Sequence, residues 1–106
     1  MGYFRVMRSY DVIDRLKKAE PALRAAGVGA LYLFGSHARG EAANDSDVDV
    51  FVDPQADETF GFLDFMKAYE TIVDAVGQNV DVGYSTREGL SRYIRDSVER
   101  EARRIF

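Results

Sequence analysis

The sequence contains no cysteine and only one histidine among its 106 residues. Without cysteine the chain can form neither disulfides nor cysteine-ligated zinc sites, and it has no thiol nucleophile. No apolar run is long enough to span a bilayer, and the first residues, MGYFRVMRSYDV, lack the apolar core of a signal peptide. These absences predict a cytoplasmic protein with no membrane anchor.

The composition is that of a globular domain, with 46% hydrophobic and 30% charged residues. The length predicts a single domain over residues 1–106, without a separate substrate-binding lobe. The net charge of −4 argues against a protein that grips nucleic acid through its phosphates. Residues 86–106 nevertheless hold six arginines against four acidic residues. We interpret this end as a solvated helix, and a contact surface for a partner or phosphate is the alternative.

Apolar spacing predicts three longer helices. The first covers residues 9–26 and is divided at Pro21, because proline suits a first turn and breaks a helix interior. The second covers residues 60–76, and its aromatic and methionine stripe is typical of core. Ser85 followed by Glu88 is a capping-box pattern and predicts the start of the last helix. The apolar residues of that helix are Leu90, Ile94, Val98 and Ile105.

Three strands are expected between these helices, at residues 30–34, 47–53 and 79–84. Pro54 ends the second strand because it has no N–H to give to a sheet, and Gly77 is a helix stop. With a short helix after the first strand, the order α-β-α-β-α-β-α predicts an α/β (α+β) fold with a short sheet.

Two aspartates stand at the start of the second expected strand. Side chains alternate along a strand, so Asp47 and Asp49 point the same way, about 7 Å apart along the chain. Asp81 has the same kind of apolar neighbours in the third strand. If the two strands are neighbours, three carboxylates converge on one patch, and like charge raises the pKa of at least one of them. Oxygen donors without histidine or cysteine select Mg²⁺ or Mn²⁺.

The alternative interpretation of strand aspartates is a solvated face, which we adopt for Asp53 and Asp57. Aspartate is a poor strand former, so two in one strand carry a cost in stability. A repeated local cost of this kind indicates a functional site at Asp47 and Asp49.

A Gly-Ser turn follows the first expected strand. Backbone N–H groups around Gly35 and Ser36 can form a cradle for an anion, to which Ser36 adds a hydroxyl. Arg39 is near enough to add a permanently charged donor for a phosphate oxygen. Taken alone, Gly-Ser after a strand usually marks only a tight turn.

Other familiar motifs are excluded. No Gly-Lys-Ser/Thr follows the turn, so it is not a P-loop, and the glycines at 27 and 29 precede a strand, so they form no dinucleotide fingerprint. His37 has no hydrolase motif around it, which argues against a Ser-His-Asp hydrolase. We interpret His37 as a loop residue, with a role at a nucleotide as the alternative.

Together, the GS pair at 35–36, ten intervening residues and DVD at 47–49 resemble the signature of the DNA polymerase beta nucleotidyltransferase superfamily. The run ARG at 38–40 and Ser46 directly before the DVD resemble its small prokaryotic branch, the minimal nucleotidyltransferases (MNT), as in the antitoxins of HEPN/MNT toxin–antitoxin pairs. The resemblance covers most of the chain and implies a nucleotidyltransferase fold with a short mixed sheet packed with helices. Asp81 matches the third carboxylate of the family more loosely.

This resemblance implies a catalytic role for each carboxylate. Asp47 and Asp49 would bind two Mg²⁺ ions, or Mn²⁺, that bridge the phosphates of a nucleoside triphosphate, here ATP. Asp81 would complete the metal site nearest to the attacking hydroxyl. An in-line attack on the α-phosphorus would then release pyrophosphate. The residues implied to hold the β and γ phosphates are Gly35, Ser36 and Arg39.

By the same resemblance, the acceptor is a tyrosine of a HEPN ribonuclease toxin encoded by the adjacent gene. The chain would form a hetero-oligomer with that toxin and silence it by AMP transfer, with no direct contact to nucleic acid or membrane. Two rival functions stay open: nucleotide transfer to a small molecule of the aminoglycoside type, and neutralisation of a toxin by binding alone. The three aspartates count against a purely binding role.

Overall fold

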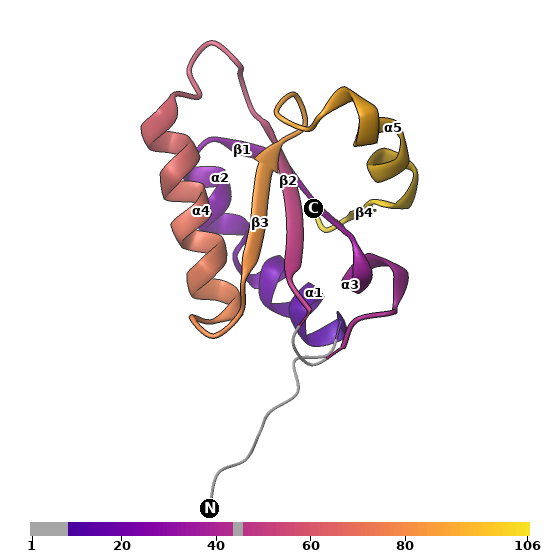
Figure 1. The fold of residues 1–106 in the computed structure, drawn as a ribbon. Helices are drawn as coiled ribbons and strands as arrows, with labels where there is room; N and C mark the ends of the chain where they lie inside the picture. The colour runs from indigo at the N-terminus through magenta and orange to yellow at the C-terminus, as the bar shows by residue number, and fades with distance from the viewer. Residues whose placement is uncertain (1–8, 44–45) are drawn as a thin grey trace, which may run out of the picture.

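A computed structural model describes residues 9–43 and 46–106 as helices and strands in alternation (Figure 1). The helices are α1 (Ser9–Lys18), α2 (Glu20–Ala25), α3 (Ser36–Arg39), α4 (Phe62–Val76) and α5 (Arg92–Glu101). The strands are β1 (Val28–Phe34), β2 (Val48–Pro54), β3 (Val82–Thr86) and β4 (Arg103–Arg104). The expected order is confirmed, including the division of the first helical segment near Pro21, except that a short fourth strand follows α5.

The strands form one mixed sheet in the order β3-β2-β1-β4. Strand β1 pairs antiparallel with both β2 and β4, whereas β2 and β3 run parallel. Helix α4 lies along one side of the sheet and α5 along the other (Figure 1). The short mixed sheet packed with helices that the family resemblance implied is therefore confirmed.

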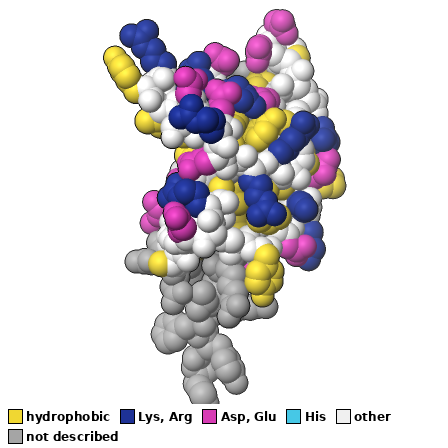
Figure 2. Space-filling model, turned by 90° about the vertical axis from the view of Figure 1, so that its right-hand side faces the viewer, with side chains coloured by type: hydrophobic (Ala, Val, Ile, Leu, Met, Phe, Trp, Pro, Cys, Tyr) yellow, Lys and Arg dark blue, Asp and Glu magenta, His cyan; other side chains and the backbone are white. Residues whose placement is uncertain are grey.

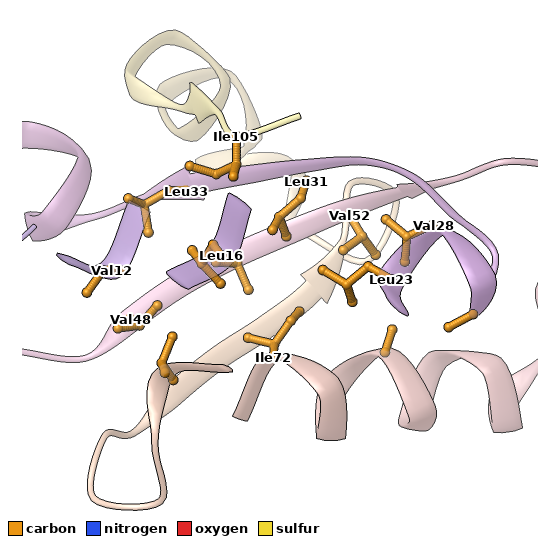
Figure 3. Close-up of a cluster of buried hydrophobic side chains, with 14 residues drawn as sticks. Val12, Leu16, Leu23, Val28, Leu31, Leu33, Val48, Val52, Ile72 and Ile105 are labelled. Carbon is orange, nitrogen blue, oxygen red and sulfur yellow. The ribbon is translucent and has the colours of Figure 1, made fainter. Parts of the chain in front are cut away.

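Alternation along β2 separates a main core from a second face. Val48, Val50 and Val52 are fully buried in the main cluster, where they meet side chains from α1, α2 and α4 such as Leu16 and Ile72 (Figure 3). This burial removes apolar surface from water at about 25 cal/mol per Å² and fixes the register of the strand, because a one-residue slip would turn the valines outward.

The opposite face of β2 carries a smaller apolar cluster. Phe51 is fully buried there against Val98 of α5, and its ring stacks on Tyr32 with centroids 4.7 Å apart. Every second side chain along a strand points to the same face, so Asp49 lies on the same face of β2 as Phe51. Helix α5 packs on this face through Val98.

The last third of the chain differs from the expected boundaries. Strand β3 begins at Val82, so Asp81 directly precedes it, and Ser85 lies inside β3 opposite Phe51 instead of capping a helix. The true N-cap of α5 is Ser91, whose hydroxyl accepts the Tyr93 N–H. The capping-box prediction was wrong because strand pairing with β2 extended the strand through the polar residues.

The C-terminal residues also depart from the predicted helix. Helix α5 ends at Glu101, and the chain then pairs with β1 through β4. Ile105 is buried through its contact with the sheet, while Ile94 is 48% exposed on α5. Within residues 9–43 and 46–106, no helix is long and apolar enough to cross a membrane.

Two helix boundaries predicted from the sequence, at Pro21 and Gly77, are confirmed. Pro21 lies in the first turn of α2, directly after α1 ends, and Gly77 is the C-cap of α4 with a φ of 105°. A positive φ of this size is readily adopted only by glycine, which explains why the helix stops there.

Candidate active site

The parallel pairing of β2 with β3 brings the aspartates to one edge of the sheet. Val48 pairs with Val82, and the Val48 N–H donates to the Asp81 carbonyl at 2.9 Å. Asp47 and Asp81 therefore stand at the starts of neighbouring strands, and the adjacency on which the convergence of the carboxylates depended is confirmed. Asp49 lies one step further along, opposite Gly83.

The three side chains differ in burial. Asp47 and Asp81 are exposed, whereas Asp49 is half-buried. In the described part of the chain, no three histidine or acidic side chains stand close enough together to form a ready metal-ligand set. The register therefore places the backbone positions side by side, and the metal assignment of Asp47, Asp49 and Asp81 stays a prediction.

Two glycines leave space for the Asp49 carboxylate. Gly35 follows β1 with a φ of 76°, and a Cβ there would lie 2.5 Å from Asp49 Oδ2. A Cβ on Gly83 would overlap Asp49 Oδ1 from the other side. Gly35 is the glycine of the Gly-Ser turn, whereas Gly83 was not singled out from the sequence. Both are required by the close approach of one carboxylate.

The environment of Asp49 favours its protonated form. Burial raises the pKa of Asp49, and the nearby charge of Asp47 raises it further, while His37 and Arg39 act in the opposite direction. The like-charge crowding expected from the DVD spacing is therefore present. A divalent cation beside Asp49 would relieve this cost, because it would replace repulsion with attraction.

The Gly-Ser turn opens a helix of four residues, Ser36–Arg39, as expected. Its donors already have a partner that the sequence did not reveal. The Gly35 N–H donates to Glu101 Oε1 at 3.3 Å, and Arg39 Nη1 donates to Glu101 Oε2 at 2.9 Å. Arg39 Nε also donates to Glu41 Oε1 at 2.6 Å. Glu101 has no local sequence signal, because it is 62 residues from Arg39.

His37 is not the loop residue that the sequence indicated. It lies in α3 and is only 2% exposed, with its Nδ1 at 3.1 Å from Ser9 Oγ of α1. Burial lowers the pKa of His37, although a backbone hydrogen bond with Ser46 and the charge of Asp49 partly oppose that shift. His37 therefore links α1 to the segment directly before the aspartates.

Two arginines of the C-terminal end, Arg87 and Arg95, make hydrogen bonds within the fold. Arg87 makes two hydrogen bonds of 2.9 Å to the Asp53 carboxylate and one to Glu99, and Arg95 donates to backbone carbonyls. Figure 2 shows acidic and basic side chains intermixed on the side of the molecule that carries α3 and α5. Asp53 is therefore an ion-pair partner and not merely a solvated residue.

Comparison with known sequences identifies a family and a relative that cover much of the chain. Residues 12–105 match the family described as nucleotidyltransferase domain. The protein adenylyltransferase MntA of Thermococcus cleftensis is 41% identical over 70 residues, which cover 64% of this chain and 69% of that protein.

Solved structures with the same fold include two of known description. A structure described as a proposed minimal nucleotidyltransferase superposes with a TM-score of 0.76 at 30% identity, covering 92% of this chain and 95% of that one. A toxin–antitoxin structure with AMP-PNP has the same fold, with a TM-score of 0.63 at 19% identity over 85% of this chain and 72% of that one.

Proposed function

Because this chain belongs to the nucleotidyltransferase domain family, we propose that it transfers AMP from ATP to a protein hydroxyl. The acceptor in this proposal is a tyrosine of a HEPN ribonuclease toxin encoded by the adjacent gene, which the transfer silences in the cytoplasm. The observation that carries the proposal is the placing of Asp49 directly beside Gly35 of the Gly-Ser turn, with Asp81 at the start of the neighbouring strand.

The acidic residues fit a divalent cation. Asp47, Asp49 and Asp81 offer only carboxylate oxygens, the donors that Mg²⁺ and Mn²⁺ prefer. Gly35 and Gly83 admit the Asp49 carboxylate between their two backbones, which holds it in one position. When bound, two Mg²⁺ ions would neutralise triphosphate charge beside these residues. We treat residues 1–106 as one minimal domain that performs this reaction.

The turn supplies the donors for the phosphates. In the proposal, the Gly35 N–H, the Ser36 hydroxyl and the Arg39 guanidinium hold the β and γ phosphates, and Arg39 adds a permanent positive charge. Holding the triphosphate in this way leaves the α-phosphorus facing the acceptor. Catalysis then depends mainly on positioning and charge neutralisation, which a small scaffold can provide.

The transfer step conserves all atoms. The acceptor hydroxyl oxygen forms a bond to the α-phosphorus, and the bond from that phosphorus to the oxygen bridging to the β-phosphate breaks. Pyrophosphate leaves with the electron pair of that bond, and the hydroxyl proton passes to water. The product is a phosphodiester between AMP and the tyrosine.

The names of the relatives support the choice of acceptor. The Thermococcus relative is named a protein adenylyltransferase, and the toxin–antitoxin structure contains AMP-PNP, an ATP analogue. We extend these descriptions to this chain and add the HEPN class and the tyrosine as our own proposal. A complex of this chain with its toxin would bring the acceptor hydroxyl to the edge of the sheet.

Intact-mass spectrometry tests the proposal. Purified protein, Mg²⁺ and ATP are incubated with the product of the adjacent gene, and we expect that product to gain AMP units. An Asp49→Asn variant and a reaction with EDTA serve as controls, and neither is expected to modify the toxin. Neutralisation of the toxin by both wild type and Asp49→Asn without any mass change would instead establish a binding antitoxin. A parallel reaction holds an aminoglycoside in place of the toxin, and AMP transfer in that reaction alone would establish the small-molecule function.

A further inference from the structure

Glu101, the last residue of α5, reaches across to the Gly-Ser turn. One oxygen of its carboxylate accepts the Gly35 N–H, and the other accepts Arg39 Nη1. Its side chain is 26% exposed, so the contact is partly shielded from water. A single carboxylate thereby occupies two donors that the proposed function assigns to phosphate.

The backbone fixes this carboxylate beside the turn. Leu33 pairs with Arg103 and Tyr32 with Arg104 in the antiparallel ladder of β1 and β4. Continuing that register by two residues places Glu101 opposite Gly35. The chain beyond is anchored as well, since the Ile105 N–H donates to the Leu31 carbonyl at 2.8 Å. Strand pairing therefore fixes the backbone position of Glu101 beside the Gly-Ser turn.

We propose that Glu101 belongs to the nucleotide site as a competitor of the triphosphate, holding Gly35 and Arg39 until phosphate oxygens displace it. This inference rests on the proposed function. Carboxylate and phosphate oxygens are the same kind of acceptor for an N–H or a guanidinium, and one N–H cannot serve both fully. A carboxylate left beside the phosphates would also repel them.

Displacement requires only a rotation of the Glu101 side chain, because β4 can keep its pairing with β1. In the absence of nucleotide, Glu101 holds the Arg39 guanidinium close to the turn, so the donors are already gathered when ATP arrives. The cost is a weaker affinity for ligands that need these donors. A ligand without phosphates does not compete with Glu101.

The test is calorimetric titration of ATP with Mg²⁺ into wild type, Glu101→Gln and Glu99→Gln, without acceptor. Glu101→Gln keeps the size of the side chain and removes the charge, and we expect its ATP affinity to rise roughly three- to tenfold. Glu99 is on the same helix and pairs with Arg87, so Glu99→Gln is a matched control that should bind ATP like the wild type. Adenosine, which has no phosphate, should bind all three equally.

A structural role for Glu101 would give the opposite sign, because loosening the turn weakens binding. Unchanged or weaker ATP binding by Glu101→Gln, or an equal gain in Glu99→Gln, overturns the inference while leaving the proposed function standing. Glu101→Ala should change ATP affinity in the same direction as Glu101→Gln, and thermal melting confirms that each variant is folded. Failure of wild type to bind ATP at all would overturn the proposed function, and this inference with it.

Discussion

Gly83 lies directly opposite Asp49 in the parallel ladder between β2 and β3, where any larger residue would overlap the Asp49 carboxylate. The glycine at this position is therefore explained by the aspartate beside it. Glycine is unfavourable inside a strand because it loses more conformational freedom on folding than other residues. This loss of stability accompanies the placement of the Asp49 carboxylate between the backbones of Gly35 and Gly83.

A Gly83→Ala substitution should disturb the site more than its size suggests. The new methyl group must push the Asp49 carboxylate aside, so we expect AMP transfer to fall by about 100-fold, as for a 1 Å misplacement of a catalytic group. The overlap should also cost about 1–3 kcal/mol in the free energy of unfolding. Mass spectrometry of the acceptor and urea unfolding measure the two effects.

Gly61→Ala provides the matched control for that experiment. Gly61 has a φ of −89°, and a Cβ there would meet only Asp64 Oδ2, at 3.9 Å. Transfer by Gly61→Ala should stay close to that of wild type. Equal activity of Gly83→Ala and Gly61→Ala would show that the position of Asp49 is unimportant.

Asp49→Asn should abolish transfer and make the metal-free protein slightly more stable. Burial and Asp47 raise the pKa of Asp49, so its ionised form is disfavoured in the folded state. The folded state thus holds this proton to higher pH than the unfolded state does, and its stability falls as pH rises. Removing the charge should gain less than about 1 kcal/mol at pH 7, because water screens a half-exposed group.

Urea unfolding in EDTA measures this gain, which should shrink as the pH falls below about 4, the ordinary pKa of aspartate, because Asp49 then becomes protonated in both states. Mg²⁺ should then raise the stability of wild type but not of Asp49→Asn. Asp57→Asn, an exposed loop position, is the control and should alter neither activity nor stability. Full transfer by Asp49→Asn would contradict its assignment as a metal ligand.

The local sequence pattern predicted most of the helices and strands, but not the boundaries of those in the last third of the chain. The valines of β2 and the apolar stripe of α4 carry strong periodic signals, and both elements formed where expected. Ser85 followed by Glu88 predicted the start of a helix, yet pairing with β2 keeps Ser85 and Thr86 in β3. Strand β4 consists of two arginines, and its pairing with β1 depends on tertiary contacts that no local pattern records.

The same limit applies to the candidate site. The DVD spacing and the Gly-Ser turn pointed to one patch because their signals are short-range. Gly83 and Glu101 act on that patch from β3 and α5, which only the folded chain brings near. His37 was placed in a loop because its burial under Ser9 of α1 could not be read from its neighbours.

Arg87, directly after β3, links this strand to helix α5 through Glu99. Its guanidinium pairs with Asp53 and Glu99 and lies 4.9 Å from the ring centres of both Tyr32 and Phe51. Arg87→Met should leave two carboxylates without their partner and lower the free energy of unfolding by about 1–3 kcal/mol. Urea unfolding measures the loss. Arg92→Met is the control, because Arg92 stacks on the exposed ring of Tyr93, and its loss should change little.

Arg87→Lys should recover only part of that loss. Lysine keeps the charge, but it has no planar guanidinium to make the paired hydrogen bonds to Asp53 or to lie against the two rings. Complete recovery by lysine would show that charge alone matters at this position. An equal loss of unfolding free energy in Arg92→Met would show that the contacts of Arg87 add no particular stability.

Acid should weaken the fold through His37. Burial lowers the pKa of His37 in the folded state, so below about pH 6.5 the unfolded chain takes up a proton that the folded chain resists. The unfolded state then binds more protons, and stability is lost as the pH falls, by at most about 1.4 kcal/mol per pH unit from this group. His37→Asn keeps a polar group near Ser9 but cannot titrate, so its unfolding free energy should fall less between pH 7 and pH 5. Urea titrations at both pH values measure the difference, and identical slopes for the two proteins would show that His37 does not control the acid response.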